Sequence, residues 1–170
     1  TDSYEYDTPK NDRIVSFELF YKEDSFSIIS FTTFGEETLY QVESIMVDPS
    51  NNTLLVADEN KEHYKIAVLD LNSGENIGAK LQDFIFITDP EGIALVKTSK
   101  TSGYWIATEQ SKTDNKFHLF DRESFEYLNT LYLEGVSNTD GITTAYMHGH
   151  WYLYAVDNDR RVAAFQLPEI

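Results

Sequence analysis

Three acidic residues recur at a nearly constant interval, each at the start of a short apolar stretch. Glu43 leads the stretch 44–47, Glu91 follows 48 residues later, and Asp140 follows after another 49 residues. Carboxylates brought together from distant segments are ligands that hard divalent cations such as calcium prefer. The spacing therefore predicts a cation site. The alternative is a repeated turn in which each side chain accepts backbone N–H bonds.

The charge balance narrows the classes of partner. The chain has 29 acids against 13 bases, a net charge of −16. Nucleic acid is not expected as a partner, because phosphate backbones are bound through Lys and Arg. The acids either form a solubilising surface or partly converge on a cation.

Three further features are missing from the sequence. Cysteine is absent, which excludes disulfides, thiolate metal sites and cysteine nucleophiles. No apolar run approaches the about 18 residues that cross a membrane, so no membrane association is expected. No secretion signal is recognisable, so we expect a cytosolic chain or one whose signal has been removed.

Strands must position the acids. Aromatic and β-branched residues are frequent, which favours strands, and no stretch shows a sustained helical period. Short apolar or alternating segments separated by turn residues predict an all-β fold, with strands at 13–21, 25–34, 44–47, 53–57, 64–69, 80–87, 93–96, 104–108, 116–120, 126–133, 142–146, 151–156 and 161–167.

The strands group into units of the length typical of a β-propeller blade, with about four strands in each. The expected single domain contains a partial blade (12–40), two blades (41–88 and 89–137) and a second partial blade (138–170). A plain antiparallel meander or sandwich is the alternative. Closing a six-bladed ring takes roughly 270 residues, so these three to four blades predict half of a propeller. The other half would be missing, on another chain, or supplied by a second copy in a homo-oligomer.

At the acid-led strands the sequence resembles the β-propeller phytases, calcium-dependent enzymes that hydrolyse inositol hexakisphosphate (phytate). The matching motifs are Asp-x-Glu-Gly at 89–92, Gly-Tyr-apolar-apolar-Ala-x-x-Gln at 103–110, acid-Arg at 121–122 and Thr-Asp-Gly-Ile at 139–142. The segments QVESIMV (41–47) and VADE (56–59) match the blade before. The match runs from about Arg13 to Phe165 and covers only the C-terminal half of the family's fold.

The resemblance implies roles for particular residues. The carboxylates of Glu43, Glu59, Glu91 and Asp140 would face a central channel and bind the calcium ions that hold substrate phosphates. Asp89 would bind a separate structural calcium. Apart from what the resemblance implies, Gln110 is expected either to orient substrate or to brace its loop. The resemblance also implies a secreted or periplasmic protein, and no catalytic side chain is identified.

The sequence departs from the family pattern in three places. Ser44 follows Glu43 where the family has glycine, and the loop 134–138 is shorter and lacks an aspartate ligand. The basic residues and calcium ligands of the family's N-terminal half have no counterpart here. We therefore expect a phytase-like (3-phytase) calcium-dependent phosphomonoester hydrolase whose activity needs the other propeller half. The alternatives are a non-catalytic, calcium-stabilised binding module and a lactonase- or esterase-like six-bladed hydrolase.

No metal or substrate role is expected for several of the remaining polar residues. Asp58, Glu109 and Asp157 are predicted to be solvated rather than ligating. Arg122 is predicted to form an ion pair at a blade turn rather than to clamp phosphate. The histidines lack the partners of a zinc site: His63 and His118 are isolated, and His148 and His150 form a turn.

Overall fold

The computed structural model describes residues 13–34 and 39–168. These residues form antiparallel strands and one short 3-10 helix, which confirms the all-β prediction, and none of their helices is long and apolar enough to cross a membrane. The elements in chain order are β1 (Ile14–Lys22), β2 (Ser25–Phe34), β3 (Val42–Asp48), β4 (Thr53–Asp58), β5 (Lys65–Asp70), η1 (Lys80–Asp83), β6 (Pro90–Lys97), β7 (Gly103–Glu109), β8 (Lys116–Asp121), β9 (Tyr127–Tyr132), β10 (Ile142–Met147), β11 (His150–Asp157) and β12 (Arg161–Gln166).

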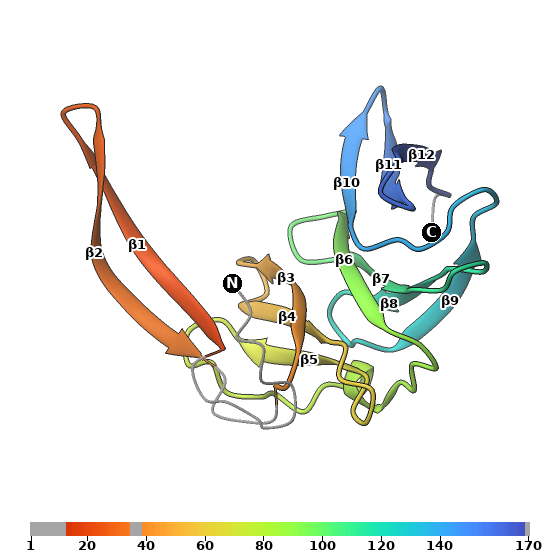
Figure 1. The fold of residues 1–170 in the computed structure, drawn as a ribbon. Helices are drawn as coiled ribbons and strands as arrows, with labels where there is room; N and C mark the ends of the chain where they lie inside the picture. The colour runs from red at the N-terminus through yellow and green to blue at the C-terminus, as the bar shows by residue number, and fades with distance from the viewer. Residues whose placement is uncertain (1–12, 35–38, 169–170) are drawn as a thin grey trace.

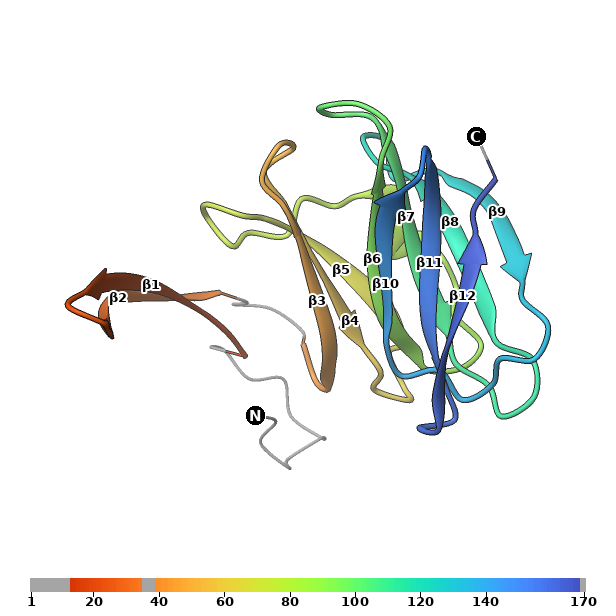
Figure 2. The same ribbon diagram turned by 90° about the horizontal axis from the view of Figure 1, so that it is seen from above.

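The strands form four small sheets that follow one another along the chain: β1-β2, β3-β4-β5, β6-β7-β8-β9 and β10-β11-β12. Figure 1 shows the last three sheets as a packed body from which the β1–β2 hairpin projects. β6 contacts both β3 and β10, the first strands of the sheets before and after it. Figure 2 shows the sheets from above. This order agrees with successive blades, and closure into a ring stays a prediction.

The middle strands are apolar because sheets cover both of their faces. Every residue of β4 is buried, as is every residue of β7 after Gly103, which explains why these segments read as continuous apolar runs rather than alternating ones. Leu55, Trp105 and Phe120 belong to a core that joins the second and third sheets. Phe117 and Leu153 belong to the core that joins the third and fourth.

The turns after the third strands repeat the same hydrogen bonds. Asp70 accepts bonds from the backbone N–H groups of Asn72 (2.9 Å) and Ser73 (2.8 Å). Asp121 accepts the equivalent bonds from Glu123 (3.0 Å) and Ser124 (2.7 Å). These backbone bonds lower the pKa of both carboxyls, because they stabilise the charged form.

The strand predicted at 80–87 is wrong. This segment contains η1 and irregular chain, and its side chains Leu81 and Phe86 are buried in the core between two sheets. The fourth position of the second sheet is taken by an earlier segment, where Asn76 bridges Leu69 and the Ile77 N–H donates to the Val68 carbonyl (3.0 Å). The apolar residues at 80–87 therefore reflect core filling rather than a strand.

A buried ion pair connects the second and third sheets. Arg122, predicted to pair at a blade turn, pairs instead with Asp48 at the end of β3, and both side chains are fully buried. The guanidinium donates through Nε to Asp48 Oδ2 and through Nη2 to Oδ1, both at 2.7 Å. Nη1 donates to the carbonyls of Ser99 (3.2 Å) and Ser102 (2.9 Å). The arginine is therefore structural, because every nitrogen that it offers is engaged within the fold.

We predict that Asp48→Ala lowers the free energy of unfolding by about 3–5 kcal/mol, because it leaves a buried guanidinium without its counter-charge. Urea denaturation followed by circular dichroism measures the loss. Lys22→Ala, which removes an exposed pair with Glu23, is the control and should leave the denaturation midpoint unchanged. Equal midpoints for Asp48→Ala and the unsubstituted chain would contradict the structural role of the pair.

Candidate metal centre

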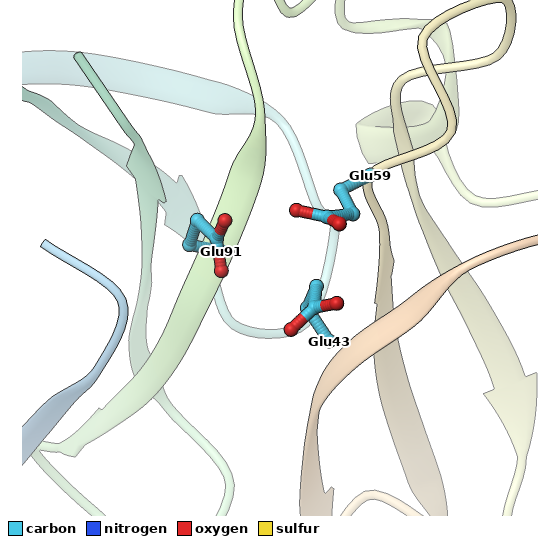
Figure 3. Close-up of side chains that lie close together, drawn as sticks. All are labelled: Glu43, Glu59 and Glu91. Atoms are coloured by element: carbon cyan, nitrogen blue, oxygen red, sulfur yellow. The ribbon is translucent and has the colours of Figure 1, made fainter. Parts of the chain in front are cut away.

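Three glutamates from two sheets converge on one point. Glu43 lies in β3, Glu59 directly follows β4, and Glu91 lies in β6. One carboxylate oxygen of each lies within 4.8 Å of those of the other two. Figure 3 shows the three carboxylates around a shared space. We call these residues the acid triad; the structure brings together three of the four residues predicted to face a channel.

Irregular strand pairing occurs at both lead glutamates. The register of β3 against β4 shifts between Val42 and Ser44, and that of β6 against β7 shifts between Pro90 and Ile93. Such bulges bend a strand locally and change the direction of a side chain, and they are common beside functional sites. Glu43 and Glu91 lie within these shifts. The regular alternation of side chains between the two faces of a strand therefore does not fix the directions of these two side chains.

Close contact between neighbouring first strands explains the residues that follow the lead acids. A Cβ atom at Gly92 would lie 2.8 Å from the backbone nitrogen of Ile142 in β10, so the third and fourth sheets approach too closely for any side chain there. At the equivalent position in β3, the Ser44 hydroxyl donates a 2.5 Å hydrogen bond to the Glu91 carbonyl. The departure from Glu-Gly at 43–44 thus supplies a bond between sheets.

The triad is electrostatically unfavourable without a cation. Glu91 is only 6% exposed. Burial, a hydrogen bond with Glu59 and the negative charges of Glu59, Glu43 and Asp140 raise the pKa of Glu91 to about 9. Each cause disfavours the charged carboxylate. A bound divalent cation would remove this penalty by supplying the missing opposite charge.

Asp140, the third lead acid, lies in a second cluster. Its carboxylate accepts a hydrogen bond from the Gln110 amide. Burial and the neighbouring Asp159 carboxyl raise the pKa of Asp140, while the Gln110 bond lowers it. Asp140 also acts on the triad, because its charge contributes to the raised pKa of Glu91.

The two clusters are built on the same plan. Glu59 and Gln110 each directly follow a second strand and donate a backbone N–H to the linker before their own sheet, at 2.9 Å and 2.8 Å. Each side chain then bonds to the lead acid of the next sheet, Glu59 to Glu91 and Gln110 to Asp140. The Glu59–Glu91 contact joins two acids. In the second cluster Asp140 also has an acidic neighbour, Asp159, but the Gln110 amide lowers the pKa of Asp140. The amide partly offsets the repulsion there, so the first cluster has the greater need for a cation.

Asp89 lies outside the triad. The Tyr64 hydroxyl bonds to its carboxylate, and burial together with this bond and the charges of Asp89 and Glu59 raises the pKa of Tyr64 to about 12. Asp89 also accepts the Gln110 backbone N–H through its carbonyl. The predicted separate calcium role of Asp89 stays a prediction.

The prediction that Asp58, Glu109 and Asp157 are solvated is wrong. All three are buried, and each accepts backbone N–H bonds from the linker that leads into its own sheet. Asp58 accepts from Tyr40 (2.8 Å) and Gln41 (2.9 Å), Glu109 from Ile87 (3.0 Å), and Asp157 from Ser137 (3.0 Å). These acids are structural, because a buried carboxylate needs such donors.

His118 is buried and contacts two polar side chains. Its Nδ1 lies 2.8 Å from the Thr130 hydroxyl and its Nε2 lies 3.4 Å from a Glu109 oxygen. Burial lowers the pKa of the imidazole, against the opposing effect of Glu109. Exposed His63 stacks on the Tyr40 ring, with centroids 4.7 Å apart.

Asp159 belongs to the second cluster, and sequence reasoning missed it. It has a positive φ of 54° in the turn between β11 and β12. The available signal was the concentration of acids directly after a second strand, which Asp157 and Asp159 share with Asp58 and Glu59.

No family model matches the chain, and no curated protein matches it. The resemblance to β-propeller phytases and the assignment of calcium therefore stay predictions. The functional argument accordingly depends on the geometry and charge of the acid triad.

We predict that, in the presence of a chelator, the chain loses stability relative to Glu91→Gln as the pH rises from 5 to 9. The pKa of Glu91 is raised from 4.5 to about 9 in the folded state, so the unfolded chain releases this proton first and the folded state is progressively disfavoured. Urea denaturation midpoints at several pH values measure the difference between the two proteins. A pH-independent difference would show that the Glu91 pKa is not raised.

Proposed function

We propose that the chain forms part of a six-bladed β-propeller and that its acid triad binds calcium in a phytase-like phosphomonoester hydrolase. Inositol hexakisphosphate is the proposed substrate, and the remaining blades would come from outside one copy of these residues. The observation that carries the proposal is the convergence of Glu43, Glu59 and Glu91 from two sheets onto one point. The series of sheets with adjacent first strands supports the propeller.

The triad fits calcium in ligand type and in number. Calcium takes about six to eight oxygen ligands, mostly carboxylates and carbonyls. Three carboxylates would fill part of this shell and leave positions for phosphate oxygens. The raised pKa of Glu91 supports the same conclusion, because its causes include the charges of nearby acids that a divalent cation would offset.

Bound calcium would turn a negatively charged site that repels phosphate into one that attracts it. It would also polarise the ester for hydrolysis. The chain's own residues would position the ligands: the Gln110 amide holds Asp140, and Ser44 holds the Glu91 backbone. A pocket of about 870 Å³ beside Glu59 is also lined by Lys61 and His63. It gives room and donor groups for further phosphates of a polyphosphorylated substrate.

A second candidate function is a calcium-stabilised binding module without catalysis. The observation that favours it is that the triad spans two sheets, with Glu43 and Glu59 on the second and Glu91 on the third. A cation there would tie the sheets together and stabilise the folded state by its binding free energy. This role needs no residue outside the chain.

We predict that isothermal titration calorimetry detects calcium binding to the chain and that Glu91→Gln weakens it at least about tenfold, since it removes one of three charged ligands. Glu123→Gln is the matched control: Glu123 is an exposed acid in the turn between β8 and β9, and its loss should leave the affinity unchanged. Binding that is equally affected by both substitutions would reflect the overall negative charge and contradict a specific site.

We predict phosphate release from inositol hexakisphosphate when the propeller is complete. The release should require calcium, stop on addition of EGTA, and be lost in Glu91→Gln but kept in Glu123→Gln. A calcium-dependent rise in melting temperature without phosphate release would favour the binding module. Turnover of lactones or carboxylic esters without phosphate release would contradict the phosphatase assignment.

A further inference from the structure

The β1–β2 hairpin leaves the packed body as an isolated two-stranded ribbon (Figure 1). Within the described residues, only its base is held by the core, where Ile14 and Phe34 pack with Leu39 against the second sheet. Two-stranded ribbons are at best marginally stable in water on their own. The hairpin therefore needs a further covering surface to persist in this conformation.

The strand register gathers apolar residues on one face of the hairpin. Directly paired residues lie on the same face, and the pairs on this face are Phe17–Phe31, Leu19–Ile28 and Tyr21–Phe26. The other face carries Ser16–Thr32, Glu18–Ser30, Phe20–Ser27 and Lys22–Ser25. The apolar hairpin face consists of Val15, Phe17, Leu19, Tyr21, Phe26, Ile28 and Phe31.

These side chains are unusually exposed for their type. Their exposed fractions run from 39% for Val15 to 71% for Phe26. Contiguous exposed apolar patches of this kind mark interaction sites rather than ordinary surface. The face contains no charged residue, since Glu18 and Lys22 lie on the opposite side.

We propose that the apolar hairpin face binds the same face of a second copy of this chain. Large apolar side chains bury about 150–250 Å² each when fully covered, so the face offers on the order of 800 Å² per copy at its observed exposure. About 800 Å² per partner is what a stable protein–protein interface needs. The hairpin alone is therefore large enough to hold a dimer.

Face-to-face pairing suits this surface because it is self-complementary. In a two-fold symmetric dimer the same patch of both copies forms the interface. The two hairpins would stack as two layers about 10 Å apart with their apolar faces buried between them, as the sheets of a β-sandwich do. Two copies of the chain repel one another, because each has a net charge of −16. Salt screens that repulsion, so the dimer should be stronger at high ionic strength.

The proposal concerns a different surface from the acid triad and stands or falls independently of the proposed function. Sedimentation velocity of the full chain over a range of concentrations tests it directly. We expect a concentration-dependent shift from 19.6 kDa to twice that mass, more pronounced at high salt. Phe17→Ser combined with Phe31→Ser should raise the dissociation constant at least about tenfold, because two large apolar contacts are lost.

Phe20→Ser is the matched control, because Phe20 is an exposed phenylalanine of the same hairpin on its opposite face. It should leave the dissociation constant unchanged. Introduced cysteines give a second test that does not depend on hairpin stability, since the described chain has none of its own. Ile28→Cys should form a disulfide-linked dimer on oxidation, whereas Ser27→Cys, on the opposite face, should not.

A monomer at every concentration would overturn the proposal and leave the face to a complementary propeller half or another partner. Dimers or larger assemblies that persist in the Phe17→Ser, Phe31→Ser variant would also overturn it. So would equal cross-linking through positions 28 and 27. Calcium titration of the same samples keeps the result separate from the metal centre, because loss of the dimer should leave calcium binding by the triad intact.

Discussion

The close approach of the first strands is the constraint on which the rest of the structure depends. At Gly92 the backbones of β6 and β10 leave no room for a Cβ atom, and on the other side Ser44 joins β3 to the Glu91 carbonyl. The Thr144 hydroxyl makes a further bond of this kind to the Leu95 carbonyl (2.7 Å). Because these strands lie so close together, Glu43 and Glu91, which are 48 residues apart in sequence, each place a carboxylate oxygen within 4.8 Å of the other.

The same proximity has an energetic cost. A carboxylate as deeply buried as Glu91, beside other acids, opposes folding at neutral pH, and buried apolar sheet faces and the Asp48–Arg122 pair hold the sheets together against this repulsion. Retaining unfavourable groups at one point of an otherwise well-packed structure is typical of a binding site. In the second cluster the Gln110 amide donates to Asp140, which shows how the same geometry is built when a neutral donor takes the place of one acid.

The sequence predicted most of the strands, their order and the position of the lead acids at the start of the first strands, because alternation, turn residues and a repeated acid are local signals. The role of these acids as metal ligands stays a prediction. It failed where the outcome depends on distant chain. Asp58 and Glu59 are adjacent acids, yet one binds the backbone of the incoming linker and the other joins the triad; nothing in their residue types separates these roles. The pairing of Arg122 with Asp48 crosses 74 residues, and the apolar residues near Phe86 fill a core instead of forming a strand.

The buried acids at the ends of the second strands have a consequence for how such a chain can grow. Asp58, Glu109 and Asp157 each hydrogen-bond to the linker that leads into their own sheet. Each of these three sheets therefore contains, within its own sequence, the acid that holds its linker. A duplicated sheet would include this acid together with its linker, and it would need no matching residue elsewhere in the chain. Sheets could therefore be added by gene duplication, and the residues facing neighbouring units, such as Glu59 and Gln110, would remain free to diverge toward new ligands.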